Sequence, residues 1–216
     1  MTDHHEPGLL FDMDGTLLDS TPLVEQIWTE FAGRHGHAPE AVIAFAHGRP
    51  TRATVTQFLP AGLDVDDEVE RIAAAEAAQT GGIVALPGAR EYLDGLPPDR
   101  WAVVTSATRA VATIRMAAAG LPSPRVLVTS EDVEQGKPSP EGYLRAARLL
   151  GRDPAECLVF EDAGPGITAG RRSGAEVVVV GTYSGDAAAG LRRIADFSAL
   201  ADAGGRTPRA ERVGAR

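Results

Sequence analysis

Two aspartates, one residue apart, follow a short apolar run near the beginning of the sequence. The run covers residues 9–11, the acids are Asp12 and Asp14, and Gly15 comes directly after them. On a β-strand, side chains two residues apart point to the same face, so the two carboxylates are expected side by side at the end of a strand. Neighbouring carboxylates repel each other unless a cation or a shared proton lies between them. The spacing therefore indicates a cation or proton-sharing site, although taken alone it also fits an acidic turn.

Three further groups of polar residues stand at or after the ends of apolar runs. Thr105-Ser106 follows residues 101–104, Lys137-Pro138 lies in the loop after residues 126–128, and Glu161-Asp162 follows residues 157–160. Each group alone is also typical of a helix cap or a solvated loop. In an open α/β sheet, however, ligands bind beyond the carboxyl ends of the strands. Together with the aspartate pair, these groups predict a metal site and an anion site in one crevice.

Carboxylates, hydroxyls and a lysine in one crevice suit the chemistry of phosphoryl transfer. A carboxylate can attack a phosphorus atom and form an aspartyl-phosphate. Mg²⁺ takes oxygen ligands, and proteins usually hold it with one or two carboxylates together with phosphate oxygens and waters. A lysine and small hydroxyls can neutralise and orient the phosphoryl oxygens. The residue types therefore favour a reaction of a phosphate ester that uses Mg²⁺.

Short apolar strands alternate with helices in the part of the chain that would position these groups. Strands are expected at residues 9–11, 101–105, 126–128, 157–160 and 177–180, and helices up to 96, at 108–119, at 140–150 and from 166 onward. Fully apolar strands in this alternation are typical of a parallel sheet covered by helices on both faces. The sequence therefore predicts an α/β fold whose core is a Rossmann-like, doubly wound parallel sheet.

The stretch between the first strand and residue 85 has a mainly helical pattern. One helix is expected to begin near Pro22 and to end by Gly36, others cover residues 52–58 and 66–80, and no strand is expected. We therefore predict a small α-helical cap domain, residues 18–84, inserted into an α/β catalytic core of residues 1–17 and 85–200. Residues 201–216 lack periodicity and are expected to form a flexible tail.

In order and spacing, the four groups resemble the four motifs of the haloacid dehalogenase-like phosphatase superfamily. The matching residues are Asp12-Met13-Asp14-Gly15-Thr16, Thr105-Ser106, Lys137-Pro138 and Glu161-Asp162, and the resemblance covers residues 8 to about 200. The helical insertion is similar to the cap of the subgroup that contains sugar-phosphate and glycerol-phosphate phosphatases and β-phosphoglucomutase. Residues 99–106 and 135–138 are especially similar to phosphatases that act on deoxyglucose phosphate and glycerol phosphate.

The resemblance implies a catalytic role for Asp12, Asp14, Thr105 and Lys137, and a phosphate-binding role for Ser106. Asp12 would be the nucleophile and also a Mg²⁺ ligand. Asp14 would protonate the leaving oxygen and then activate the hydrolytic water, while its backbone carbonyl binds the metal. Thr105 and the backbone of Ser106 would hold the phosphoryl group. Lys137 would bridge the nucleophile and the phosphate that is being transferred.

The resemblance also implies the remaining metal ligands and the activity. Asp162 would bind the metal, and Glu161 would support it or contact a metal-bound water. The implied protein is a Mg²⁺-dependent phosphatase that hydrolyses a small phosphomonoester, such as a sugar or polyol phosphate, through an aspartyl-phosphate. Glycerol phosphate and phosphoglycolate are close competitors as substrates, and the sequence does not decide among them.

Other activities of the superfamily fit the motifs less well. A dehalogenase needs neither a metal nor an acid at the position of Asp14, and a phosphonate hydrolase of the family uses a cap lysine, which residues 17–84 lack. A β-phosphoglucomutase-like mutase is the closer alternative, but family mutases have a histidine where this chain has Val24. A non-catalytic phosphate-binding protein would be expected to have lost one of the motif aspartates. The turn at Gly164 matches a dinucleotide-binding fingerprint poorly.

The cap is expected to select the substrate, because residues at the sheet edge contact only the phosphate. His47 and Arg49, before the helix expected at residues 52–58, are the candidates for contacting the leaving group, and Arg52 is a weaker one. They match a family motif only approximately, and a loop with solvated charges explains them equally well.

Composition limits the partners and the location. A formal net charge of −9 argues against nucleic acid or an anionic membrane as the main partner. The single cysteine, Cys157, lies in an apolar run and is expected to be a buried thiol. A polar N-terminus and the lack of a long apolar run predict a cytoplasmic protein. The expected partner is a small phosphorylated metabolite, and nothing in the sequence indicates the oligomeric state.

Overall fold

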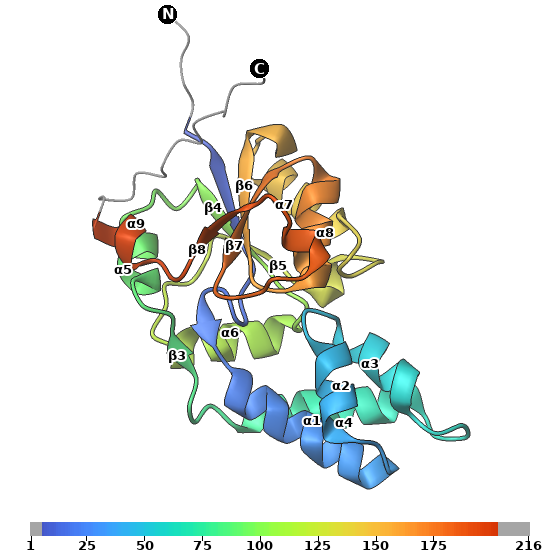
Figure 1. Cartoon of the computed structure of the whole chain (residues 1–216). Coiled ribbons are helices and arrows are strands. Elements are labelled where there is room, and N and C mark those ends of the chain that lie inside the picture. Colours follow the sequence, from blue (N-terminus) through green and yellow to red (C-terminus); the bar gives the residue numbers. More distant parts are fainter. Residues whose placement is uncertain (1–5, 203–216) are drawn as a thin grey trace, which may run out of the picture.

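The computed structural model describes residues 6–202 and builds them around a six-stranded parallel sheet (Figure 1). In spatial order the strands are β5 (Val126–Val128), β4 (Trp101–Val104), β1 (Gly8–Phe11), β6 (Cys157–Glu161), β7 (Glu176–Val180) and β8 (Arg192–Ile194). Along the chain, the strands after β1 are added first on one side of it and then on the other. The predicted doubly wound parallel sheet is confirmed, and its order reverses between β1 and β6.

Helices cover both faces of this sheet. They are α5 (Ala89–Asp94), α6 (Arg109–Ala118), α7 (Glu141–Leu149), α8 (Gly164–Ser173) and α9 (Ser198–Asp202). Short 3₁₀ turns lie at Ser130–Asp132, Pro154–Glu156 and Asp186–Ala188. Leu9 and Phe11 of β1 share a core with α5, α6 and α9, whereas Leu10 shares a second core with α7 and α8. Successive residues of one strand therefore serve two separate cores, as a sheet buried on both faces requires.

Phe11 lies at the centre of an aromatic cluster at the middle of the sheet. Its ring stacks on that of Phe160 at a centroid distance of 4.8 Å and meets Tyr92, Trp101 and Phe197 edge-on at 5.9–6.4 Å. All five side chains are at least 97% buried. Aromatic pairs in these geometries add to the stabilisation from buried area.

Residues 18–84 form a helical layer beyond the carboxyl ends of the strands, which we call the cap (Figure 1). Its helices are α1 (Thr21–His35), α2 (Pro39–Ala46), α3 (Thr51–Phe58) and α4 (Val65–Ala78). Apolar residues of α1, including Ile27 and Phe31, are buried at helical spacing, and Gly36 ends the helix in a left-handed conformation. In α4, the side chain of Asp64 caps the first turn.

The chain enters and leaves the cap through a two-stranded antiparallel ribbon that the sequence did not predict. It consists of β2 (Leu18–Asp19) and β3 (Val84–Ala85), and Leu86 N donates a further hydrogen bond to Leu17 O at 2.9 Å. Two residues are too few to show a strand periodicity. We propose this ribbon as the boundary between cap and core.

Three other elements differ from the expectation. Strand β8 contains Arg192 and Arg193, so it lacks an apolar run, and α9 is only five residues long. Helix α8 begins at Gly164, two residues earlier than expected. Of the predicted tail, residues 201 and 202 belong to α9, and residues 203–216 lie outside the described part of the chain. Within residues 6–202, no helix combines the length and apolarity that crossing a membrane requires.

Replacing Phe11 with alanine is expected to lower the free energy of unfolding by about 3–5 kcal/mol, because the cavity cannot be refilled by four packed rings. Urea unfolding would show this as a lower midpoint at an unchanged slope. Leu149→Ala, at a side chain that is 56% exposed, is the control and should change stability by less than about 0.5 kcal/mol. A loss below about 1 kcal/mol for Phe11→Ala would show that the cluster does not hold the sheet together.

Candidate active site

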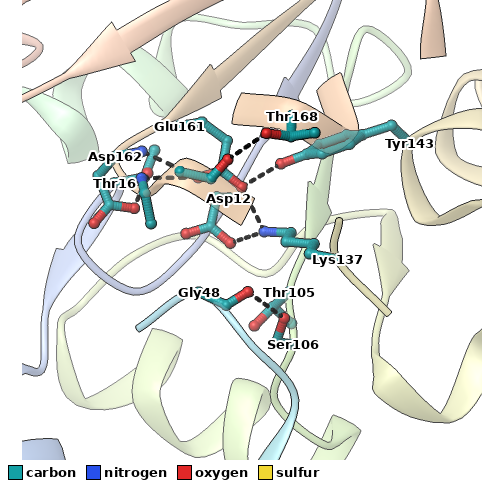
Figure 2. Close-up of polar contacts among 12 residues, drawn as sticks. Asp12, Thr16, Gly48, Thr105, Ser106, Lys137, Tyr143, Glu161, Asp162 and Thr168 are labelled. Carbon is teal, nitrogen blue, oxygen red and sulfur yellow. Dashed lines mark hydrogen bonds and ion pairs between the residues drawn. The ribbon is translucent and has the colours of Figure 1, made fainter. Parts of the chain in front are cut away.

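The carboxyl ends of β1, β4 and β6 bring the four sequence motifs together (Figure 2). Asp12 follows β1, Thr105 follows β4, and Glu161 is the last residue of β6. Asp12 N donates to Phe160 O at 3.0 Å and Thr105 N donates to Val128 O at 2.9 Å, so sheet hydrogen bonding extends to both residues. The motifs therefore meet beside the point at which the strand order reverses, where α/β sheets bind ligands.

Lys137 is the only lysine in the sequence, and its ammonium group is buried between two carboxylates. Its Nζ contacts Asp12 Oδ1 and lies 2.7 Å from Oε1 of Glu161. Burial by itself would lower the pKa of Lys137, but the charges of Asp12 and Glu161 outweigh it and raise the pKa above its ordinary value. Lys137 therefore places a positive charge against the carboxylate of Asp12, for which the family resemblance implies the role of nucleophile.

Glu161 is 1% exposed and has protein partners at both carboxylate oxygens. Tyr143 OH donates to Oε1 at 2.7 Å, the oxygen that Lys137 also contacts. The backbone N–H groups of Asp162 and Ala163 donate to Oε2 at 3.1 and 3.3 Å. Because its oxygens are engaged in this way, Glu161 is better placed to order the loop after β6 than to bind a metal directly.

Sequence reasoning missed Tyr143. It lies on the buried face of α7, where an aromatic residue is ordinarily explained by the core. No signal in the sequence separates it from such a residue, since its partner Glu161 is 18 positions away. Only the packing of α7 against the sheet shows that its hydroxyl group reaches the site.

Asp162 lies on the side of Asp12 that faces away from Lys137 and completes a cluster of three acids (Figure 2). Oxygens of Asp12, Glu161 and Asp162 lie within 4.8 Å of one another, and Thr16 Oγ1 donates to Asp162 Oδ1 at 3.2 Å. Burial, with the charge of Glu161, raises the pKa of Asp162 to about 7, and burial also raises the pKa of Asp12 despite the nearby Lys137. Carboxyl groups with raised pKa values that lie this close together suit a hard divalent cation such as Mg²⁺. Its charge would stabilise the ionised carboxylates.

Two glycines make room for these acids. Gly15 has a φ of +83°, and a Cβ at this position would overlap the carboxylate of Asp162. A Cβ on Gly166, in the first turn of α8, would overlap the carboxylate of Glu161. In the sequence Gly15 directly follows the two aspartates, but neither glycine could be connected with the carboxylate that it accommodates before the strands were placed.

The side chain of Asp14 has hydrogen-bond partners outside the acidic cluster. Ser20 Oγ donates to Asp14 Oδ1 at 2.6 Å, and a guanidinium nitrogen of Arg115 donates to the same oxygen at 2.9 Å. Asp14 also lines the cleft between cap and core. The structure therefore gives the two motif aspartates different side-chain partners, although both of them line the cleft. A metal contact through the Asp14 backbone stays a prediction.

Thr105 and Ser106 form the side of the site opposite the acidic cluster. Thr105 is buried, and its hydroxyl accepts a hydrogen bond from Ala107 N at 3.0 Å. The hydroxyl of Ser106 donates to the carbonyl of Gly48 in the cap at 3.3 Å, as Figure 2 shows. Thr105 and Ser106 line the same cleft as Asp12, which is where a phosphoryl group would have to lie.

The cleft between core and cap is lined by both polar and apolar side chains. Its cap side is formed mainly by Val24, Glu25, Trp28, Ile43, His47, Arg49 and Glu76. The mixture suits a small ligand with both hydroxyl groups and a carbon skeleton.

The three predicted cap residues are placed differently from one another. His47 and Arg49 both line the cleft. The guanidinium of Arg49 donates to Phe45 O at 2.7 Å and lies 4.4 Å from the centre of the Phe45 ring, so the preceding helix α2 already binds it. Arg52 forms an exposed ion pair with Asp66, outside this cleft.

Comparisons with known proteins agree with this arrangement. A family model described as haloacid dehalogenase-like hydrolase matches residues 7–174. Hexitol phosphatase A of Escherichia coli K12 is 46% identical over 80% of this chain and 82% of its own length. Glycerol-1-phosphate phosphohydrolase 2 of Saccharomyces cerevisiae is 34% identical over 80% of this chain and 74% of its own length.

A solved structure shares the fold. The crystal structure of a β-phosphoglucomutase from Clostridium difficile superposes with a TM-score of 0.78 and covers 90% of this chain and 92% of its own. At 19% identity this likeness concerns the fold alone. The family match over residues 7–174 and the 46% identity to one relative carry the assignment. The chain belongs to the haloacid dehalogenase-like hydrolase family.

Proposed function

We propose that this protein is a Mg²⁺-dependent phosphatase that hydrolyses a small sugar or polyol phosphate through an aspartyl-phosphate on Asp12. The named relatives are phosphatases, and the chain is a phosphoric monoester hydrolase. The observation that carries the mechanism is the position of Asp12, which contacts Lys137 and faces both the acidic cluster and the cleft. The cytoplasmic location expected from the sequence stays a prediction.

In the first half-reaction, Asp12 attacks the phosphorus atom and the bond from phosphorus to the leaving oxygen breaks. Asp14 gives its proton to that oxygen, so the alcohol leaves uncharged. Lys137 neutralises charge on the phosphoryl oxygens, and Thr105 and the backbone of Ser106 hold the group in place. These residues supply position and charge, which are the main requirements of phosphoryl transfer.

In the second half-reaction, Asp14 takes a proton from a water molecule that attacks the phosphorus atom. The bond between phosphorus and the Asp12 oxygen breaks, which releases inorganic phosphate and restores the carboxylate. Asp12, Asp162 and the Asp14 backbone carbonyl would hold Mg²⁺, with Glu161 in support. When bound, Mg²⁺ supplies positive charge to the phosphoryl oxygens.

The substrate class follows from the cleft and from the relatives. The names of the two relatives refer to a hexitol phosphatase and a glycerol-1-phosphate phosphohydrolase. Here the cleft offers Glu25 and His47 as hydrogen-bonding groups and Trp28 as an apolar wall. A polyhydroxylated carbon chain would match this lining, and a phosphometabolite screen for released phosphate would rank the candidates.

Replacement of Asp12 by asparagine is expected to abolish phosphate release, because an amide oxygen is too weak a nucleophile to form the intermediate. The fall should be at least about 10³-fold, measured by released phosphate with a polyol phosphate. Lys137→Arg should also be inactive, since the bulkier guanidinium does not fit between the two carboxylates. Arg148→Ala, at the far end of α7, is the matched control. More than a trace of turnover by Asp12→Asn would exclude the covalent mechanism.

A phosphosugar mutase is the alternative, because a β-phosphoglucomutase shares the fold. Val24 lies on α1 in the cleft, at the position of the mutase histidine, and cannot exchange protons. With β-glucose 1-phosphate as substrate we therefore expect free glucose and inorganic phosphate. Glucose 6-phosphate formed without inorganic phosphate, seen by product chromatography, would establish the mutase instead.

The affinity for Mg²⁺ is expected to rise with pH. Asp162 has a pKa of about 7 in the metal-free protein and must lose its proton to bind a cation. Its ionised fraction increases about tenfold between about pH 6 and pH 8. Because burial raises the pKa of the second proposed ligand, Asp12, as well, the dissociation constant should fall at least about tenfold over this range. Isothermal titration calorimetry would measure this, and Asp162→Asn should weaken the pH dependence. An affinity independent of pH would show that Asp162 is not a ligand.

A further inference from the structure

Arg115 is a buried arginine that connects the core with the cap. It lies on α6, is 3% exposed, and donates from one terminal nitrogen to Asp14 Oδ1 and from the other to Glu76 Oε1, both at 2.9 Å. Glu76 belongs to α4 of the cap, and α4 packs against α6. One guanidinium therefore joins the proposed proton donor to a cap helix.

The contacts to Asp14 distinguish its two oxygens. Ser20 and Arg115 both donate to Oδ1, at 2.6 and 2.9 Å. Among residues 6–202, Oδ2 of Asp14 makes no hydrogen bond. The two donors thus hold one oxygen in place and leave the other to exchange a proton with a ligand in the cleft that Asp14 lines.

The guanidinium is itself held from the cap side. Both residues line the cleft, where the Arg115 side chain is 4% exposed and the Glu76 side chain 12% exposed, and Arg115 reaches Glu76 only when α4 lies against α6. A planar guanidinium with two terminal nitrogens bonded to two carboxylates has little rotational freedom. The position of α4 therefore limits the orientation of the group that holds Asp14.

We propose that Arg115 and Glu76 are positioning residues that orient Asp14 toward the leaving oxygen when the cap lies against the core. This inference rests on the proposed phosphatase function and adds two residues to it. Neither residue needs to contact the phosphate or the substrate. They act on the rate through proton donation by Asp14. Their effect should therefore increase with the basicity of the leaving oxygen.

Substituted phenyl phosphates test this dependence, because they share one shape and differ in the basicity of the leaving oxygen. For Arg115→Met, kcat/KM with phenyl phosphate and with a polyol phosphate should fall about 10²-fold, the range that general acid catalysis contributes. With p-nitrophenyl phosphate, whose leaving group departs as a stable anion, the fall should be less than about threefold. The plot of log kcat/KM against leaving-group pKa should therefore become steeper.

Two milder variants keep the test decisive if Arg115→Met does not fold. Glu76→Gln preserves shape and removes the charge on the cap side, and Ser20→Ala removes the second donor to Asp14 Oδ1. Both should steepen the same plot, with losses of about 3- to 10-fold for phenyl phosphate. Arg100→Met is the matched control, since Arg100 is another buried arginine paired with a carboxylate, that of Glu6, at the opposite end of the sheet. It should leave the slope unchanged.

The outcomes separate this inference from the proposed function. Equal losses for all phenyl phosphates would overturn it, because the residues would then act on folding or on phosphate binding. A loss confined to polyol phosphates would also overturn it, since Arg115 would then bind the substrate itself. A wild-type protein that hydrolyses none of these esters would instead refute the proposed phosphatase function.

Discussion

The ammonium group of Lys137, buried between Asp12 and Glu161, is the interaction on which the site depends. Three carboxylates lie within 4.8 Å of one another there, and the positive charge of Lys137 offsets part of their mutual repulsion. Every other basic side chain among the 21 lysines and arginines is an arginine. A compact ammonium fits between two carboxylates and a phosphoryl group, whereas a planar guanidinium needs more space.

The fold provides the geometry for this interaction at little conformational cost. Asp12, Thr105 and Glu161 belong to the ends of three adjacent strands, so sheet hydrogen bonds fix their backbones. Glu161 is fixed again by Tyr143 and by two backbone N–H groups. Sites built on regular elements in this way hold reacting groups more precisely than sites on loops.

The cap completes the site from the other side. The loop after α2 contacts the loops that follow three strands of the core. Gly48 O accepts a hydrogen bond from Ser106, and a Cβ on Gly48 would lie 3.0 Å from that of Ala163. Pro50 packs against Gly136. The described conformation is therefore one with the cap against the core. Closing a cap excludes water and strengthens electrostatic interactions inside a site. Arg115 crosses the same cleft, which makes the position of the cap relevant to Asp14.

By itself, the sequence determined the parallel sheet, the helical insertion and the motif residues at the strand ends, because apolar periodicity and strand-end chemistry are local signals. It did not predict β2, β3, β8 or α9, because these elements are short or polar. Only the tertiary structure decided the partners of those motif residues. Tyr143 and Glu161 are 18 positions apart, and Arg115 and Asp14 are 101 positions apart. In the sequence, a side chain that reaches a site across the core looks like an ordinary core residue. For that reason the residues at the strand ends were enough to predict chemistry on a phosphate ester, but not the partners that hold Asp14.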